Sequence, residues 1–339
     1  MLTLSSKMQN IIEKTCKGKT HIKLTVGAFA EGEKTIQTFG ETGEIPNENY
    51  VYEIGSNTKT ILASLLAKYV HEGKMALDDS ISKYIDGLDS SAYYPTLKRL
   101  VTHTAGYAPH LEIGLWTGIR LLFDMMFRSS ANKGFLPFKV DEAKMKRLLL
   151  ENKMKDKDYP WHYSNFSYAL LGHAIGAVSG RGYWDTMDDY LTNDLKMINS
   201  CTGKRAVKKL HGFDKKNRDI GNWNWGNDVI APAGDVFSTA DDMLTYARIN
   251  AYDEMPYLSL CHKKYADLSK RLAGKFDMGL GWPLDKNNHN ILVGSGGTGA
   301  FHSILIVDKQ KKRACVVLAN YHIDLLNFMD TVLEDLKKS

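Results

Sequence analysis

The chain has 339 residues, of which 43% are hydrophobic and 24% are charged. This composition excludes a disordered or fibrous protein and provides for about two domains, or for one large composite domain. Lysine and arginine exceed the acidic residues by 44 − 39 = 5, and they stand in short scattered groups, so nucleic-acid binding is not expected. Reduced thiols are favoured over a zinc site or a disulfide framework, because no CxxC pair occurs among Cys16, Cys201, Cys261 and Cys315.

The sequence contains no segment that we expect to cross a membrane. Residues 1–19 predict a short amphipathic helix and lack the long apolar core of a secretory signal. The most apolar stretch, 113–127, contains Arg120 and Asp124 and is too short to span a bilayer. It is typical of the core of a helical domain, with a lid, an acyl-chain wall or a dimer face as the alternative. We therefore expect a cytoplasmic protein without a transmembrane anchor, unless a leader has been removed.

Strand patterns lie at both ends of the chain. Residues 21–39 contain two β-rich runs around a Glu-Gly-Glu turn, and two further runs at 300–308 and 313–321 flank a polar segment. Each pair predicts a hairpin. A helix with one apolar face is predicted over 323–338. The N-terminal and C-terminal strands are therefore expected to build one antiparallel sheet together.

The middle of the chain is mostly helical in pattern, with helices predicted over 142–154, 168–178 and 183–195. Another helix is expected to begin near 239–242, where a threonine is followed three residues later by an acid. The predicted fold is α+β. Residues 1–76 and 228–339 would form an antiparallel sheet flanked by helices, and 77–227 a mostly helical inserted domain, with the active site in the cleft between them.

The strongest local signal is the segment Ser56-Asn57-Thr58-Lys59, which leads into a predicted helix over 60–71. Lys59 lies one helical turn after Ser56 on the same face, so its amine can reach the serine hydroxyl. A serine becomes a nucleophile when a base removes its proton, and a helix N-terminus favours both a neutral lysine and an alkoxide. Alone, this S-x-x-K pattern is more typical of a capping serine followed by a surface lysine, so other motifs must support it.

A second candidate motif is Tyr163-Ser164-Asn165, which directly precedes another predicted helix. A tyrosine at such a turn can hold its hydroxyl between a serine and a lysine and pass a proton between them. Asn165 can offer both a donor and an acceptor to a substrate amide. The ordinary alternative is a buried tyrosine beside a helix-capping asparagine.

A third candidate is the glycine-rich segment 294–299, which matches the dinucleotide pattern G-x-G-x-x-G. That fingerprint opens a helix within a βαβ unit, whereas here a β-rich run follows at once, so we reject a dehydrogenase. We interpret the segment as a strand edge whose missing side chains let a substrate backbone lie against it.

Together and in this order, the three motifs resemble those of the serine β-lactamase and penicillin-binding protein superfamily, written S-x-x-K, Y-x-N and K/H-x-G. The likeness is greatest to the class C β-lactamase-like branch, which includes D-alanyl-D-alanine carboxypeptidases, D-aminopeptidases and family VIII esterases. Residues 100–106, 233–243 and 279–282 are similar to that family's LLTHTSG, AGGLVSTAEDM and GLGW stretches. The resemblance spans about residues 20–335.

The resemblance implies a role for each motif residue. Ser56 would be the acylated nucleophile, Lys59 its base and Tyr163 the proton shuttle. The backbone N–H groups of Ser56 and Gly297 would form the oxyanion hole. The substrate-binding residues would be Asn165, Gly294, Ser295 and Gly296.

Gly294 departs from the family pattern, because the usual Lys or His of the third motif falls on this position. A cation or imidazole there would face a substrate carboxylate. Penicillins and peptides with a free D-alanine carboxylate are therefore expected to be poor substrates. The missing side chain is expected to leave space for a bulkier or uncharged group, and Gly294→His to restore part of the turnover of free-carboxylate substrates.

The sequence thus predicts a serine hydrolase that cleaves an amide or short peptide through a covalent acyl-enzyme, without a metal or cofactor. A carboxylesterase on the same fold and a non-hydrolytic binding or sensor protein are the alternatives, and the oligomeric state stays open. His103 is expected to be a structural loop histidine rather than a base. Trp223 and Trp225 are interpreted equally well as cleft-lining or as packing residues.

Overall fold

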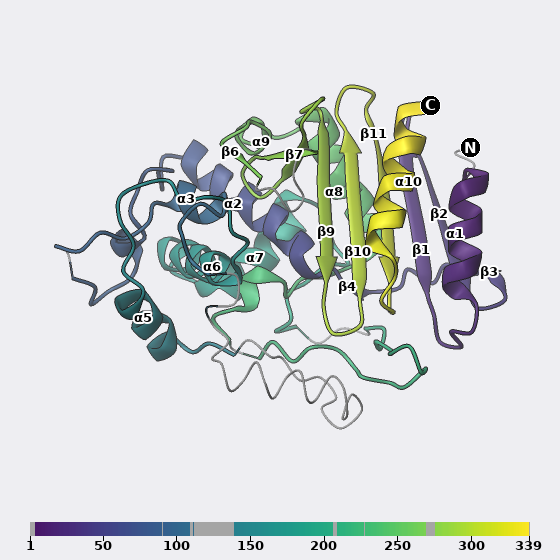
Figure 1. Cartoon of the computed structure of the whole chain (residues 1–339), viewed down its shortest axis with the longest axis horizontal. Helices are drawn as coiled ribbons and strands as arrows, with labels where there is room; N and C mark the ends of the chain where they lie inside the picture. Colours follow the sequence, from purple (N-terminus) through teal and green to yellow (C-terminus); the bar gives the residue numbers. More distant parts are fainter. Residues whose placement is uncertain are drawn as a thin grey trace.

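An antiparallel sheet joins the two ends of the chain (Figure 1). The computed structural model describes residues 4–89, 91–108, 111, 139–205, 209–226, 228–268 and 275–338. Within them the strand order is β3-β2-β1-β11-β10-β9-β8-β7-β6. The strands are β1 (Leu24–Ala30), β2 (Glu33–Gly40), β3 (Gly43–Ile45), β6 (Ala266–Asp267), β7 (Phe276–Met278), β8 (Pro283–Asp285), β9 (Ile291–Gly297), β10 (His302–Asp308) and β11 (Arg313–Ala319).

Both predicted hairpins are confirmed as β1–β2 and β10–β11. The predicted joining of the chain ends is also confirmed, because β1 pairs with β11 from Leu24↔Ala319 onward. The sequence analysis missed β6, β7 and β8, as well as a second small sheet formed by β4 (Tyr52–Glu53) and β5 (Phe237–Ser238). Strands of two or three residues are too short to show the alternation of polar and apolar residues that identifies a strand.

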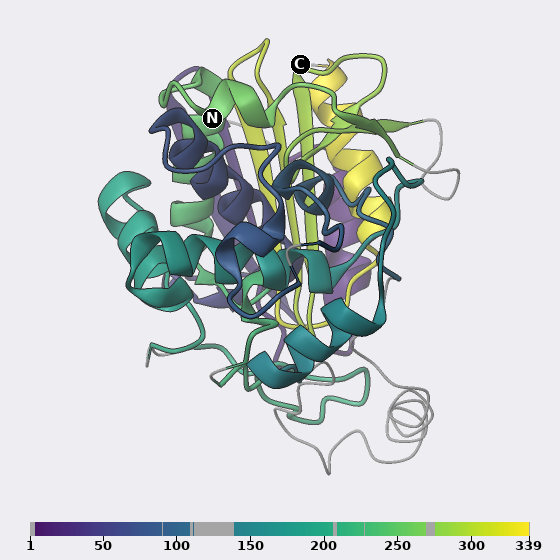
Figure 2. The ribbon, with the colours of Figure 1, turned by 90° about the vertical axis from the view of Figure 1, so that its left-hand side faces the viewer.

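Helices cover both faces of the sheet (Figures 1 and 2). The amphipathic helices α1 (Ser6–Cys16) and α10 (Leu325–Lys338) lie on one face, and α8 (Ala240–Tyr252) lies on the other. Successive strand residues point to opposite faces, so Val293 packs into the core beneath α1 and α10, whereas Leu292 packs into the core beneath α2 (Thr58–His71) and α8. The sheet is therefore buried on both sides.

The remaining helices lie mostly beside the sheet and come mostly from the middle of the chain. The predicted helices are confirmed within a few residues, except that 183–195 divides into α7 and the turn η3, and 113–127 lies outside the described residues. These elements are α3 (Leu97–Val101), α5 (Glu142–Glu151), α6 (Asn165–Ser179), α7 (Gly182–Asp189) and α9 (Leu258–Cys261), with the short turns η1 (Gly55–Asn57), η2 (Ile81–Tyr84), η3 (Tyr190–Asp194) and η4 (Ala231–Ala233).

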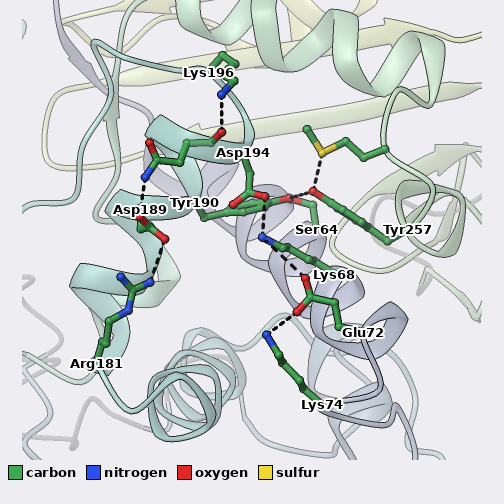
Figure 3. Close-up of polar contacts among 12 residues, drawn as sticks. Ser64, Lys68, Glu72, Lys74, Arg181, Asp189, Tyr190, Asp194, Lys196 and Tyr257 are labelled. Atoms are coloured by element: carbon green, nitrogen blue, oxygen red, sulfur yellow. Dashed lines mark hydrogen bonds and ion pairs between the residues drawn. The ribbon is translucent and has the colours of Figure 1, made fainter.

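Polar contacts hold the C-terminal half of α2 against η3 (Figure 3). The Lys68 ammonium donates to Asp194 over 2.6 Å, and the Tyr190 hydroxyl donates to Ser64 over 2.9 Å. Ser64 and Tyr190 are buried. Because buried hydrogen bonds fix the geometry of the groups that they join, these contacts set the direction in which the opposite end of α2 points.

Helix α6 packs closely against η4 at Gly172. A β-carbon at this position would come well within 3.0 Å of the Pro232 ring. Since proline is rigid, the two elements can approach this closely only because residue 172 has no side chain. The contact fixes the position of the Ala233 carbonyl at the end of η4.

Gly172→Ala is expected to destabilise the protein, although alanine favours a helix over glycine by about 1 kcal/mol. The added methyl group would be forced against Pro232, and overpacking of a core costs typically about 1–3 kcal/mol. Thermal unfolding of wild type and variant measures the sign, and Ala177→Gly, at an exposed position of the same helix, reports helix propensity alone. A higher Tm for Gly172→Ala would contradict this account of the α6–η4 contact.

Candidate functional site

Ser56 lies in η1, two residues before α2 begins at Thr58. The turn that carries it begins at Gly55, whose φ of +52° is in the left-handed region that glycine adopts readily. The side chain of Lys59, one helical turn later, places its Nζ 3.0 Å from Ser56 Oγ. The predicted pairing of these two residues through helical spacing is therefore present in the structure.

Tyr163 reaches the same serine from a distant part of the chain. Its hydroxyl lies 2.5 Å from Ser56 Oγ. The following residue, Ser164, caps α6 by accepting a hydrogen bond from the backbone N–H of Ser167 over 3.2 Å. This cap sets where α6 begins, and so fixes the turn from which Tyr163 extends.

His103 contacts the backbone and the Tyr163 ring of this turn. Its Nδ1 accepts a hydrogen bond from the backbone N–H of Ser164 over 3.1 Å, and its ring packs against the ring of Tyr163 at 4.8 Å. Burial, and secondly the neighbouring Lys59, hold the pKa of His103 well below its ordinary value. The neutral ring can accept the bond from Ser164, so His103 has the structural position that the sequence predicts.

The amine of Lys59 is enclosed by the site. Its side chain is buried, and Nζ donates to the carbonyl of Ala233 over 2.5 Å. Nζ also lies over the rings of Tyr163 and Tyr168, at 4.8 Å and 5.5 Å from their centres. These contacts hold the amine beside Ser56 Oγ. The sequence pattern did not identify the Ala233 carbonyl as a partner, because a backbone group leaves no trace in side-chain spacing.

The glycines of β9 bring a second backbone against the Ser56 turn. A β-carbon at Gly55 would lie 2.8 Å from the backbone nitrogen of Gly297, and one at Gly296 would lie 2.8 Å from the backbone nitrogen of Ser56. The N–H groups of Ser56 and Gly297, expected to form an oxyanion hole, therefore come from backbones in close contact. A pair of N–H donors at such a place can stabilise a developing negative charge.

A cavity of about 160 Å³ opens beside Ser56. It contains the predicted residues Asn165 and Gly297, whereas Gly294, Ser295 and Gly296 are not among its lining residues. Trp223 and Trp225 form one wall, with ring centres 5.5 Å apart. The complete lining is Gly55, Ser56, Tyr163, Asn165, Trp223, Trp225, Ile230, Ala233, Gly234 and Gly297. These residues include no Asp, Glu, Lys, Arg or His.

The space expected at Gly294 is filled, so that prediction is wrong. A β-carbon at this position would come well within 3.0 Å of Asn57 Oδ1. Gly294 is buried, and it pairs with Leu305 of β10, which packs into the core beneath α2. Paired residues point to the same face of a sheet, so Gly294 faces η1, where Asn57 lies. Ser295, the next residue, is exposed. Gly294→His is therefore expected to disturb the strand rather than to restore a substrate contact.

A larger cavity, about 760 Å³, lies between α1 and the strands β2 and β3 and shares no lining residue with the cavity at Ser56. It includes Cys16, but burial raises the pKa of this thiol to about 11, which makes a reactive thiolate unfavourable at neutral pH. The smaller cavity at Ser56 is therefore the candidate site. Among the described residues, no group of three or more His, Cys, Asp and Glu side chains is arranged to hold a metal ion.

Glu53 is buried behind the wall formed by Trp223 and was not identified from the sequence. Its Oε1 accepts a hydrogen bond from the backbone N–H of Trp223 over 2.8 Å, and Oε2 has no hydrogen-bond partner among the described residues. Burial raises the pKa of Glu53 to about 7, and the opposing effects of the hydrogen-bonding groups on Thr298, the Trp223 backbone and Asn222, and of the charge on Lys209, are smaller. An acid between apolar residues at 51–54 was the one available signal.

Comparisons with known proteins identify the family of the chain. The family model described as Beta-lactamase matches residues 20–327. The chain is 24% identical over 315 residues to the D-alanyl-D-alanine-carboxypeptidase/endopeptidase AmpH of Escherichia coli (strain K12), covering 84% of this chain and 76% of that protein. It is 22% identical over 288 residues to protein flp of Staphylococcus aureus (strain MW2), covering 79% of this chain and 52% of that protein. The chain thus spans about half the length of protein flp.

Solved structures show the same fold. A D-stereospecific amidohydrolase from Streptomyces sp. is similar with a TM-score of 0.76 at 19% identity, covering 97% of this chain and 98% of that one. A class C β-lactamase is similar with a TM-score of 0.74 at 19% identity, covering 98% of each chain.

In the part of the chain that the structure describes, no helix is long and apolar enough to cross a membrane.

The buried acid predicts a pH dependence of stability. Because the pKa of Glu53 rises from an ordinary 4.5 to about 7 on folding, the folded chain keeps a proton that the unfolded chain releases. The free energy of unfolding should therefore fall as the pH rises between these values, by at most about 3–4 kcal/mol at about 1.4 kcal/mol per pKa unit. Urea unfolding at pH 5 and pH 7.5, run on wild type and Glu53→Gln, measures the difference.

Glu53→Gln should lose part of this pH dependence. The rest should remain because burial also raises the pKa of Asp235 to about 7. Glu44→Gln, at an exposed acid, is the control and should behave like the wild type. An unchanged pH dependence in Glu53→Gln would show that Glu53 is ionised in the folded protein.

Proposed function

The chain belongs to the Beta-lactamase family, whose model covers residues 20–327, and we propose that it is a serine hydrolase that forms a covalent acyl-enzyme on Ser56. The observation that carries this proposal is the environment of one atom. Ser56 Oγ lies 2.5 Å from the Tyr163 hydroxyl and 3.0 Å from Lys59 Nζ. A nucleophile in hydrogen-bond contact with its candidate bases is the arrangement that nucleophilic catalysis requires.

The reaction follows from these contacts. Ser56 Oγ attacks the substrate carbonyl carbon, and its proton passes to the Tyr163–Lys59 pair. The carbonyl oxygen becomes an oxyanion, which accepts hydrogen bonds from the N–H groups of Ser56 and Gly297. When the carbonyl re-forms, the C–N or C–O bond to the leaving group breaks, and the leaving group takes the proton from Tyr163. Water then attacks the acyl-enzyme, which releases the acid and returns the proton to Ser56.

An amide or short peptide is the proposed substrate class. AmpH is named a carboxypeptidase and endopeptidase, and the Streptomyces enzyme a D-stereospecific amidohydrolase. A peptide amide also matches Asn165, which lines the cavity and can bind an amide through both its donor and its acceptor. A carboxylesterase is the second candidate, and the observation that favours it is the cavity lining without charged side chains.

Ser56→Ala should abolish covalent labelling by a fluorophosphonate, because the variant lacks the attacking oxygen. Intact-protein mass spectrometry should show one adduct on the wild type and none on the variant. Ser259→Ala, at an exposed serine away from the cavity, should be labelled like the wild type. Lys59→Ala should slow labelling almost as strongly as Ser56→Ala, since catalytic groups that act as a unit are not additive.

Labelling of Ser56→Ala at another residue would contradict the assignment of the nucleophile. A parallel exposure to a penicillin tests whether a lactam acylates the same serine. Labelling of Ser56 without turnover of any amide or ester would favour the binding or sensor alternative over a hydrolase.

A further inference from the structure

Asp235 is a fully buried acid that follows Gly234, one of the cavity-lining residues. It does not line the cavity itself, and it stands where the family stretch AGGLVSTAEDM has a glycine. The hydroxyl of Tyr183, which is also buried, donates to Asp235 Oδ1 over 2.6 Å. Because a buried polar group costs free energy unless it is hydrogen-bonded, this bond keeps the two side chains together and joins the segments that carry them.

The backbone on both sides of Asp235 binds the segment that carries the nucleophile. The Ala233 carbonyl accepts a hydrogen bond from Lys59 Nζ over 2.5 Å. The Val236 N–H donates to Thr58 Oγ1 over 3.2 Å. A backbone carbonyl is a fixed acceptor only where the chain around it is held, so the position of Asp235 bears directly on the position of the Lys59 amine.

Tyr183 connects the other end of this bond to α6. It is the second residue of α7, and a β-carbon at Gly176 of α6 would lie 2.7 Å from its backbone nitrogen. Helix α6 begins two residues after Tyr163. The bond from Tyr183 to Asp235 therefore connects the helix that follows Tyr163 with the segment that holds Lys59.

This bond and the packing of α6 against η4 restrain the same spacing from opposite sides. The contact between Gly172 and Pro232 stops the two elements from approaching further. Packed atoms resist compression strongly, whereas each of their contacts resists separation only weakly. A buried hydrogen bond resists separation, since both groups would be left without a partner away from water. Packing and hydrogen bond together fix the spacing of the two elements.

We propose that Asp235 is a positioning residue for the reaction at Ser56. Its bond to Tyr183 holds the Ala233 carbonyl in place. That carbonyl keeps the Lys59 amine 3.0 Å from Ser56 Oγ, where a proton can pass between them. Because Asp235 does not line the cavity, it acts on the rate of the chemical step and not on the binding of substrate. This inference rests on the proposed acyl-enzyme function.

The test measures how fast a fluorophosphonate labels Ser56 at rising reagent concentrations, at pH 6. These data give a limiting rate constant and a half-saturating concentration. In Asp235→Ala the limiting rate constant should fall by about tenfold or more, because a small displacement of a catalytic group is costly. The half-saturating concentration should change by less than about twofold, since the groups that bind the reagent are intact.

Two variants that preserve shape report on the bond itself. Tyr183→Phe removes only the donor hydroxyl and should slow labelling as Asp235→Ala does. The double variant should be no slower than either single variant, since both remove one bond. Asp235→Asn keeps an oxygen that can accept from Tyr183 and should label within about twofold of the wild type. Burial raises the pKa of Asp235 to about 7, so at pH 6 asparagine replaces an acid that is mostly neutral.

Tyr321→Phe is the matched control. The Tyr321 hydroxyl donates to Asn217 over 2.9 Å, the Tyr321 side chain is buried, and neither residue lines the cavity, so this variant should label like the wild type. An equal loss of rate in Tyr321→Phe, or a wild-type rate in Tyr183→Phe, would overturn the proposal. So would an Asp235→Asn variant as slow as Asp235→Ala. Where Asp235→Ala fails to fold, Tyr183→Phe carries the test.

A second comparison tests whether Asp235 acts through Lys59. In a Lys59→Ala background, whose residual labelling is followed over longer times, Asp235→Ala should cause no further loss of rate, because the amine is absent. A further loss would show that Asp235 supports the fold in general and would overturn the proposal. The two proposals fail differently. An unlabelled wild type contradicts the acyl-enzyme, whereas a labelled Ser56 with equal rates in all variants contradicts only the role of Asp235.

Discussion

The close contact between the β9 backbone and the turn that carries Ser56 is the constraint on which the rest of the site depends. A β-carbon at Gly55 would lie 2.8 Å from the Gly297 nitrogen, and one at Gly296 would lie 2.8 Å from the Ser56 nitrogen. Side chains at these positions would separate the two backbones. Their absence lets the two backbones come into contact beside Ser56, as the proposed oxyanion hole of the Ser56 and Gly297 N–H groups requires.

Both backbones are held in place by the whole fold. Strand β9 is fixed through β10 and β11 to β1, so the two ends of the chain together position its glycines. The Ser56 turn follows β4, which pairs with β5, and continues into α2, whose far end is bound to η3 through Lys68 and Asp194. Tyr163 then arrives from the start of α6. The site therefore depends on contacts among several elements that are distant in sequence.

The sequence predicts those parts of the fold and site that depend on local spacing. The hairpins, α2 and α10 follow from periodicity, and the pairing of Ser56 with Lys59 follows from one helical turn. The meeting of Ser56 with Tyr163, 107 residues apart, is a correct expectation that came from the family resemblance. It could not have come from spacing, because spacing contains no information on contacts between distant elements.

What the sequence did not predict depends on such distant contacts. Asn57 acts on its partner Ser303 across 246 residues, and it fills the space that an inspection of Gly294 alone suggests is open. Glu53 becomes important only because the fold buries it behind Trp223. The sequence analysis interpreted Gly294 as leaving open space in the site. In the structure, the Asn57 side chain occupies that space.

A crystal structure of the acyl-enzyme, trapped with a slowly hydrolysed ester, tests the central claim most directly. The account predicts a covalent bond to Ser56 Oγ, with the acyl carbonyl oxygen about 2.7–3.1 Å from the backbone nitrogens of both Ser56 and Gly297. An acyl group bonded to another residue would contradict the account. So would an acyl group on Ser56 whose carbonyl oxygen points away from both nitrogens.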